Sequence, residues 1–320
     1  MNADAAPLRY AILGSGAVGG LYGAMLTRSG CEVHFLLHSD YDHVVANGMR
    51  IDSVQGDFIL ESPHVHASVD SMPVCDVVII ALKSTRNALL DDWLPKLVAD
   101  DGVVLTLQNG LDVEADVRRT VPAGRVLGGC CFLCSNKVGP GHIHHLDYGR
   151  IAFGAYQETG VDAIVAETMG KRIEADMQNA GIDANWSDDL AKTRWRKLMW
   201  NIPFNGLSVV LDASTDQIIG SEPGRALANR LITEVHAGAA ACGVEIDSKA
   251  IRATMEHTET MVPYDSSMRL DFLAKRPMEV EAIFGNPLRA IGDRASEIAP
   301  SVCMLYEQLA FYNETICQSA

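Results

Sequence analysis

Apolar runs alternate with helix-length segments through the first half of the chain. Short β-branched and apolar runs predict buried strands at 9–13, 32–37, 76–82 and 103–107. An amphipathic stretch over 18–29 separates the first two. Strands that alternate with helices are typical of βαβ units and a parallel sheet. Three later runs joined by Gly/Pro turns predict a more antiparallel edge, at 125–134, 142–145 and 150–155.

The second half has longer, helical periodicities and few strand-like runs. Helices are predicted at 188–211, 222–242, 248–261, 278–290 and 301–315. Gly243 is placed to end one of these helices and Pro300 to begin another. We therefore expect an α/β Rossmann-type N-terminal domain followed by an all-helical C-terminal domain. The predicted division gives a dinucleotide-binding domain over 1–187 and a helical substrate and dimerisation domain over 188–320.

A glycine-rich turn follows the first predicted strand and opens the first helix. Its residues, which we predict to bind a dinucleotide, are Gly14, Ser15, Gly16, Ala17, Val18 and Gly19. In this GxGxxG pattern the first glycine permits a tight turn, the second lets the backbone approach a pyrophosphate, and the third lets helix and strand pack closely. The N-terminus of the helix adds N–H groups and a positive dipole end.

The end of the second strand ordinarily decides between NAD and NADP. A carboxylate there binds the ribose diol of NAD, whereas a basic residue accommodates the 2′-phosphate of NADP. Here the strand ends in His38-Ser39-Asp40. His38 and Ser39 could serve a phosphate, and Asp40 could serve a diol, so the residues by themselves leave both cofactors open.

A polar stripe interrupts the apolar pattern of the predicted helix 188–211. Lys197, Asn201 and Asn205 are spaced by four residues, and each such step drifts about 40° around a helix, so the three share one side. An ammonium group between two amides suits a cleft or a ligand. The alternative is a lysine that extends to solvent above two structural asparagines.

Charge and cysteine usage exclude several classes of function. The net charge of −15 argues against nucleic acid and against an anionic membrane surface, because both need clustered Lys and Arg. No apolar run approaches the roughly 20 residues that span a bilayer. The eight cysteines are irregularly spaced, which favours reduced thiols and a cytoplasmic location. Cys131 and Cys134 form a CxxC without matching partners, so we expect strand thiols and no metal.

Several motifs occur in a fixed order along nearly the whole chain. They are Gly14 to Gly19, Ala81-Leu82-Lys83, Leu107-Gln108-Asn109-Gly110, Trp195-Arg196-Lys197-Leu198 with Asn201 and Asn205, and Ser266-Ser267-Met268 followed by Glu279. Each motif alone is also explained by an ordinary turn, a helix start or a solvated charge. Together they resemble the ketopantoate reductase family (2-dehydropantoate 2-reductases).

The resemblance implies a role for each matching position. Lys197 matches the general acid that protonates the ketone oxygen, and Glu279 matches the acidic residue that hydrogen-bonds the keto or hydroxyl end of the substrate. Asn109, Asn201 and Asn205 match amides that position the substrate, with Asn109 also next to the nicotinamide. Ser267 matches a serine that binds the substrate carboxylate. Lys83 and His38 match positions near the cofactor, although the family often has arginine where this chain has His38.

The function implied is NADPH-dependent reduction of 2-dehydropantoate to pantoate, in pantothenate biosynthesis, with NAD as the alternative cofactor. One rival is a reductase of a different 2-keto acid on the same scaffold. Another is a non-catalytic nicotinamide-binding sensor. The expected partner is a small 2-keto acid, and apolar surfaces of the helical domain could support a homodimer.

Overall fold

A computed structural model describes residues 6–158, 160–263 and 265–319. The chain forms two compact units. Unit 1 comprises residues 1–108 and 113–190, and unit 2 comprises Asn109–Asp112 and Ala191–Ala320. The short loop 109–112 therefore belongs to the second unit, although the chain on both sides of it belongs to the first.

Unit 1 is built on a ten-stranded sheet whose main path runs β4-β3-β9-β8-β7-β6-β1-β2-β5, with β10 paired to β9. The strands are β1 (Arg9–Leu13), β2 (Glu32–Leu36), β3 (Met49–Ser53), β4 (Phe58–Leu60), β5 (His64–His66), β6 (Cys75–Ile80), β7 (Val98–Thr106), β8 (Val126–Gly139), β9 (His142–Ala155) and β10 (Ala184–Trp186). The segment β5-β2-β1-β6-β7-β8 is parallel and has the strand order of a dinucleotide-binding fold. The predicted Rossmann-type fold class is confirmed.

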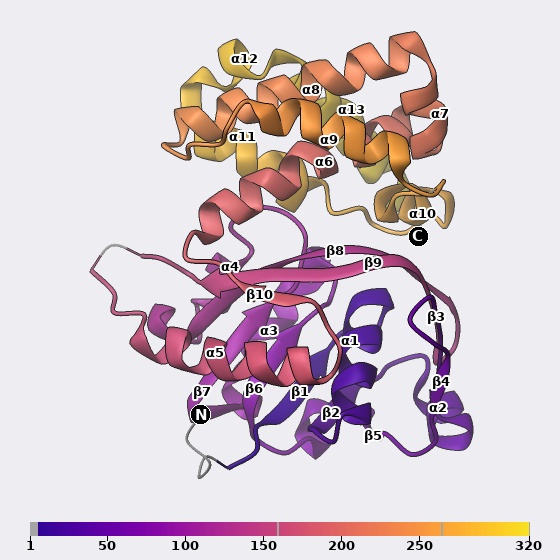
Figure 1. Cartoon of the computed structure of the whole chain (residues 1–320), viewed down its shortest axis with the longest axis vertical. Helices are drawn as coiled ribbons and strands as arrows, with labels where there is room; N and C mark the ends of the chain where they lie inside the picture. The colour runs from indigo at the N-terminus through magenta and orange to yellow at the C-terminus, as the bar shows by residue number, and fades with distance from the viewer. Residues whose placement is uncertain (1–5, 159, 264, 320) are drawn as a thin grey trace. The chain divides into compact units, whose positions relative to one another are not determined.

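Helices cover both faces of this sheet because successive strand residues point to opposite sides. Tyr10 and Ile12 of β1 belong to the apolar cluster that includes α1 (Ala17–Arg28) and α5 (Ile164–Asn179). Ala11 and Leu13 belong to the cluster that includes α3 (Leu90–Leu97). Figure 1 shows these helices along the sheet. The remaining helical elements are α2 (Tyr41–Asn47), η1 (Val69–Ser71), η2 (Ser84–Leu89), α4 (Glu114–Val117) and η3 (Ala123–Arg125).

The predicted antiparallel edge is present, but one detail was wrong. The runs 142–145 and 150–155 were expected to form two strands, and they form the single strand β9, antiparallel to β8. Tyr148 and Gly149 have positive φ angles of 61° and 123°, and the β8–β9 register shifts opposite them. The apparent turn is therefore a bulge within one strand.

Unit 2 is helical and has its own apolar core. Its elements are α6 (Leu190–Val210), α7 (Thr215–Gly220), α8 (Glu222–Ala241), α9 (Lys249–Thr260), α10 (Ser267–Leu273), η4 (Glu281–Gly285), α11 (Asn286–Ile291), η5 (Gly292–Arg294), α12 (Ala295–Ile298) and α13 (Pro300–Ser319). Gly243 has φ +76° just past α8, and α13 begins at Pro300, as predicted. The helix expected at 278–290 begins later, with a π-helical turn, η4. No helix among the described residues has the length and apolarity to cross a membrane.

Candidate functional site

The three glycines of the turn after β1 have distinct steric environments. Gly14 has φ +99°, and a Cβ there would lie 2.4 Å from the backbone nitrogen of Leu82. A Cβ on Gly19 would lie 2.3 Å from the carbonyl oxygen of Gly14. At Gly16, by contrast, an added Cβ would meet no atom within 4 Å. The first and third glycines therefore allow close packing inside the protein, and the second leaves open space beside the backbone.

That open space lies at the N-terminus of α1. Gly16 is the N-cap, no side chain caps the helix, and its first turn contains no acidic residue. Its first N–H groups and positive dipole end consequently suit an anion such as a pyrophosphate. Ser15 connects the turn to the second strand, since its Oγ donates to the carbonyl oxygen of Leu36 at 3.2 Å. Ala17 and Val18 form the first helical residues. The predicted turn thus fits a dinucleotide.

The three residues after β2 differ sharply in exposure. His38 and Ser39 are exposed, whereas Asp40 is buried. Asp40 Oδ2 accepts hydrogen bonds from the Gly141 N–H at 2.9 Å and from Lys137 Nζ at 2.6 Å. Ser39 Oγ donates to Asp40 Oδ1 at 3.1 Å. Burial alone would raise the pKa of Asp40, but the bonds from Gly141 and Lys137 outweigh it and hold that pKa below its usual range.

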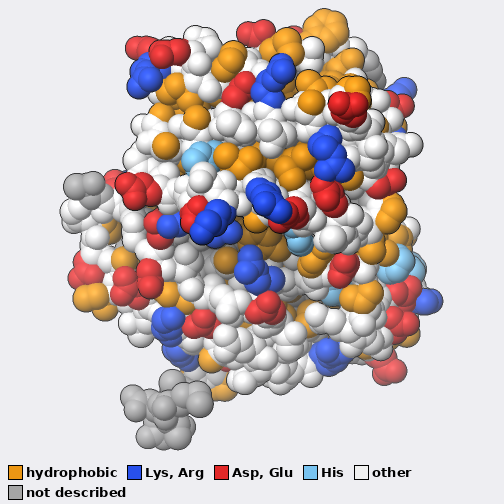
Figure 2. Space-filling view, turned by 45° about the horizontal axis from the view of Figure 1, so that its top comes forward, with side chains coloured by type: hydrophobic (Ala, Val, Ile, Leu, Met, Phe, Trp, Pro, Cys, Tyr) orange, Lys and Arg blue, Asp and Glu red, His pale blue; other side chains and the backbone are white. Residues whose placement is uncertain are grey.

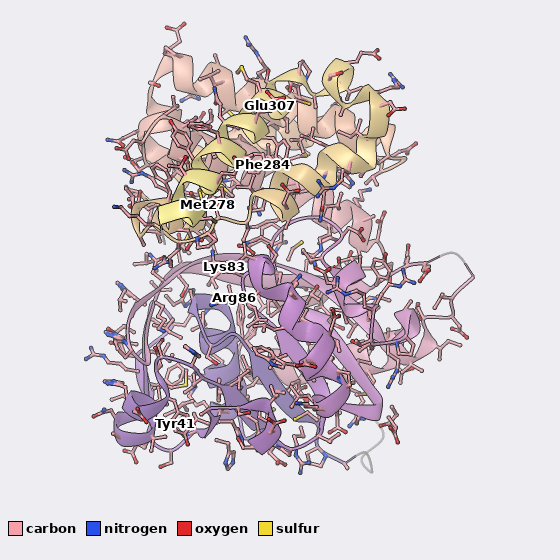
Figure 3. The ribbon with its side chains drawn as sticks, turned by 180° about the vertical axis from the view of Figure 1, so that it is seen from behind. Tyr41, Lys83, Arg86, Met278, Phe284 and Glu307 are labelled. Carbon is pink, nitrogen blue, oxygen red and sulfur yellow. The ribbon has the colours of Figure 1, made fainter. Side chains whose placement is uncertain are left out.

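Lys83 follows β6, the strand paired with β1. The segment between β6 and Lys83 packs against the glycine-rich turn, because Ala81 and Leu82 supply the atoms closest to a Cβ at Gly14. Lys83 forms the N-cap of η2, and Figure 3 shows it beside Arg86. Gln108 holds this segment through a bond from Nε2 to the Leu82 carbonyl oxygen at 3.0 Å. The backbone that leads into Lys83 is thereby fixed against the glycine-rich turn.

The predicted substrate residues lie in unit 2, and three of them are on α6. Lys197 is half-buried, and its Nζ lies 5.5 Å from the ring centroid of Trp200. Asn201 and Asn205 are each only 2% exposed. Asn201 Nδ2 donates to Asn109 Oδ1 at 3.2 Å, which brings two predicted residues from distant parts of the sequence together.

The loop that carries Asn109 is tied to the π-helical turn. The N–H of Leu111 donates to the carbonyl oxygen of Ala282 at 2.9 Å, and Asn286 Nδ2 donates to the carbonyl oxygen of Leu111 at 2.7 Å. Gly110 has φ +105° and lies directly against Ala282. These contacts fix the backbone on the C-terminal side of Asn109, which leaves its amide placed for Asn201.

The predicted residues Ser267 and Glu279 both lie between α6 and η4 in the sequence. Glu279 is 4% exposed, and its carbonyl oxygen accepts a bond from Ile283 N–H in the first turn of η4. Ser267 is half-buried and begins α10, whose N-cap Ser266 is fully buried. Ser266 Oγ lies 2.7 Å from Ser208 Oγ on α6. The serine pair is therefore anchored to α6 through Ser266, while Ser267 keeps partial exposure.

Trp200, whose indole carries a polar N–H group, was not predicted from the sequence. Its indole Nε1 is buried and has no hydrogen-bond partner among the described residues. Buried indole N–H groups ordinarily have a partner, so Trp200 is an exception on the helix that carries Lys197. Its position three residues after Lys197, on the same helix face, can be read from the spacing in the sequence.

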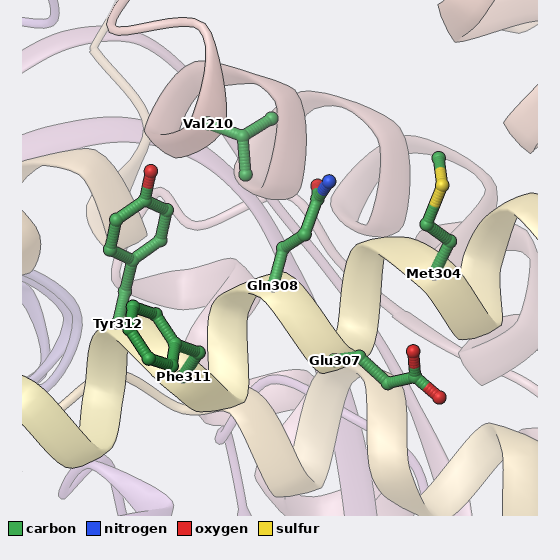
Figure 4. Close-up of a pocket in the computed structure, with 6 residues that line it drawn as sticks. All are labelled: Val210, Met304, Glu307, Gln308, Phe311 and Tyr312. Carbon is green, nitrogen blue, oxygen red and sulfur yellow. The ribbon is translucent and has the colours of Figure 1, made fainter.

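Unit 2 also contains a shallow pocket, which lies apart from the predicted site residues. It encloses about 410 Å³ between α6 and α13 and is lined by Val210, Met304, Glu307, Gln308, Phe311 and Tyr312 (Figure 4). The only charged residue in this lining is acidic, so the pocket does not suit a carboxylate substrate. None of the predicted site residues lines it.

Surface charge and metal-binding side chains do not indicate a second candidate site among the described residues. On the face in Figure 2, Lys and Arg side chains are interspersed with acidic ones, despite the net charge of −15. Cys130, Cys131 and Cys134 are buried in β8, and none of them forms a disulfide with another described residue. Within the part of the chain that the structure describes, no group of three or more His, Cys, Asp or Glu could hold a metal ion.

Comparison with known proteins connects both units to one family. The family model described as "Ketopantoate reductase PanE/ApbA" matches residues 10–158, and the model "Ketopantoate reductase PanE/ApbA C terminal" matches residues 189–313. A 2-dehydropantoate 2-reductase from Nostoc sp. is 47% identical over 306 residues, which cover 95% of this chain and 94% of that protein.

Solved structures agree with this result. The 2-dehydropantoate 2-reductase from Geobacter metallireducens GS-15 has a TM-score of 0.88 at 38% identity and covers 95% of this chain and 99% of its own. A D-mandelate dehydrogenase, in a ternary structure with NADH and anilino(oxo)acetate, has a TM-score of 0.85 at 22% identity, with 97% and 99% covered. At that identity the likeness shows the fold alone. Two family models and a relative this similar along nearly its whole length show that the chain belongs to the ketopantoate reductase family.

Proposed function

We propose that this protein reduces 2-dehydropantoate to pantoate with NADPH, as a step of pantothenate biosynthesis. The observation that carries the proposal is the bond between Asn201 and Asn109, on the helix that also presents Lys197. Asn201, one helical turn after the predicted general acid Lys197, is therefore held in place by a second amide. In unit 1, the open Gly16 and the uncapped helix of the glycine-rich turn suit a pyrophosphate.

Each residue in the proposed site has a defined task. The bound cofactor supplies a hydride, and reduction of the ketone builds negative charge on its oxygen. Lys197 Nζ stabilises that charge and delivers a proton to the oxygen. Glu279 accepts a hydrogen bond from the resulting hydroxyl. Asn201 and Asn205 orient the substrate, and Ser267 holds its carboxylate.

A reductase of another 2-keto acid is the second candidate. It is favoured by the D-mandelate dehydrogenase neighbour, because that protein shares the fold and is named for a different 2-hydroxy acid. One methylene in a pocket changes substrate discrimination by only about 1–3 kcal/mol, so small changes in the lining suffice. A sensor without turnover is the third candidate, and the presence of both Lys197 and Glu279 counts against it.

The decisive experiment is NADPH oxidation followed by absorbance, with 2-dehydropantoate beside a panel of other 2-keto acids and with NADH as the second cofactor. We expect the highest kcat/KM for 2-dehydropantoate with NADPH. Replacing Lys197 by Met should lower kcat by about 10²–10⁴-fold, the usual contribution of a general acid. Arg196→Met is the matched control, because Arg196 is the exposed neighbour on the same helix. Full activity of the Lys197 variant would refute the proposed mechanism.

The oligomeric state and the cellular location remain predictions. A homodimer is expected from the apolar surfaces of the helical unit, on which Met304 and Phe311 of α13 are exposed. A cytoplasmic location is expected from the irregularly spaced cysteines.

A further inference from the structure

The carboxylate of Asp40 is already occupied by protein donors. It is 5% exposed, one oxygen accepts from Gly141 and Lys137, and the other accepts from Ser39. Recognition of a ribose diol needs an accessible carboxylate that accepts two hydroxyl hydrogens. Asp40 therefore does not have the environment of an NAD-selecting acid, even though it stands at the expected place in the sequence.

The lysine that contacts Asp40 comes from the tip of the β8–β9 hairpin. The turn residue Gly141 is buried there, and its carbonyl oxygen accepts a bond from the N–H of Arg50 at 2.8 Å. Farther along β8, Ser135 Oγ donates to the Ala17 carbonyl oxygen at 3.5 Å, at the start of α1. Ser135 and Lys137 are alternate residues with no register shift between them, so both point to the side of the sheet that α1 covers.

The same contacts also determine which side chains near the end of β2 can donate hydrogen bonds to a phosphate. Ser39 donates its hydroxyl hydrogen to Asp40, so a phosphate would compete with Asp40 for that donor. Lys137 keeps 35% of its side chain exposed, and an ammonium group has two further donors after one is given to Asp40. His38 is exposed just before Ser39. Lys137 and His38 are therefore cationic or potentially cationic groups near Asp40 at this end of β2.

We propose that Lys137, oriented by Asp40, binds the 2′-phosphate of NADPH together with His38. In this arrangement Asp40 is a positioning residue and makes no contact with the ribose. The pair replaces the single arginine that the family often carries after the second strand. This inference rests on the proposed use of NADPH and names the residues that select it.

The test is calorimetric binding of 2′,5′-ADP and of 5′-AMP to the full chain, because these ligands differ only in the 2′-phosphate. We expect the wild type to prefer 2′,5′-ADP. Lys137→Met should reduce the affinity for 2′,5′-ADP about tenfold, the size of one charge-assisted hydrogen bond, and leave 5′-AMP unchanged. Lys137→Arg should keep the preference. Lys96→Met is the matched control, since Lys96 also forms an exposed ion pair, with Asp70 at 2.8 Å.

The competing explanations give different results. If Lys137 only supports the fold, its replacement weakens both ligands equally and overturns the proposal. An unchanged preference in Lys137→Met also overturns it. Asp40→Asn should weaken 2′,5′-ADP more than 5′-AMP, whereas a diol-binding Asp40 would give the reverse order. A wild type that does not distinguish the two ligands would contradict the proposed use of NADPH itself, which separates that failure from a failure of this inference.

Discussion

Substituting Gly110 by Ala tests how strongly the loop 109–112 depends on its contact with η4. Gly110 has φ +105°, a conformation that residues with a Cβ rarely adopt. The added Cβ would also lie 2.4 Å from the carbonyl oxygen and 2.6 Å from the carbonyl carbon of Ala282. Both contacts are with backbone, so relief requires movement of the loop or of the π-helical turn.

The expected loss in the free energy of unfolding is the sum of a backbone contribution and a packing contribution. The left-handed backbone costs a residue with a Cβ about 1–2 kcal/mol. Overpacking against a closely packed interior adds about 1–3 kcal/mol. The free energy of unfolding should therefore fall by about 2–5 kcal/mol in total. Because Asn109 is adjacent, its amide should shift away from Asn201, and kcat/KM should fall by up to about 10²-fold, the usual effect of an ångström-scale misplacement.

Gly56→Ala is the matched control. Gly56 has φ +109°, but it is exposed and a Cβ there would meet nothing within 4 Å. It should show the backbone term of about 1–2 kcal/mol without the packing term and without loss of activity. Urea denaturation followed by circular dichroism, with steady-state kinetics, measures both effects. Equal destabilisation by the two substitutions, with activity retained in both, would refute the reasoning.

Three other predictions concern separate parts of the molecule. Asn201→Leu should lower kcat/KM by about 10-fold or more, because it leaves Asn109 Oδ1 without its donor; kinetics no different from wild type would exclude a positioning role. Burial and the neighbouring charges of His34 and His64 lower the pKa of His66. The folded protein therefore favours the neutral imidazole. This contribution to stability is fully present at pH values above the ordinary pKa of 6.5 and is lost as the pH falls through the lowered pKa. The stability difference between wild type and His66→Gln should consequently narrow on acidification in urea titrations, and a constant difference would disprove the assignment. Phe311 is 68% exposed, and Phe311→Glu should convert the expected homodimer to monomers in sedimentation experiments, whereas an unchanged mass would place any interface elsewhere.

Much of the sheet was predictable because its central strands are buried on both faces. The run 9–13 matches β1 residue for residue, and Gly14, with its positive φ, ends it. The short outer strands β3, β4 and β5 gave no comparable signal, since they have three to five residues and mixed polarity. The bulge in β9 was predicted as a break because Gly149 is a turn residue locally, and pairing with β8 along the whole strand overrides that preference.

The helical spacing of the candidate site residues could be predicted from the sequence, whereas their contacts could not. Spacing places Lys197, Asn201 and Asn205 on one side of a helix, and the structure has all three on α6. That Asn109 bonds to Asn201 could not follow from spacing, because 92 residues separate them. The sequence left Asp40 open as a diol ligand, since burial and the bond from Lys137 depend on a hairpin almost a hundred residues away. Both contacts depend on the tertiary structure, so no local pattern in the sequence predicts them.

The membership of Asn109–Asp112 in the helical unit has a consequence for how the chain acquires its structure. Leu111 must wait for Asn286, which is synthesised 175 residues later, before its carbonyl oxygen can be satisfied by that partner. Contacts of such long sequence separation close late, because the chain entropy that they remove is large. A chain that ends before residue 286 would therefore lack the partner of the Leu111 carbonyl oxygen, although all the strands of unit 1 have been synthesised by then. Expression of residues 191–320 alone would likewise give helices that lack a native segment, so the two halves cannot be separated by one cut.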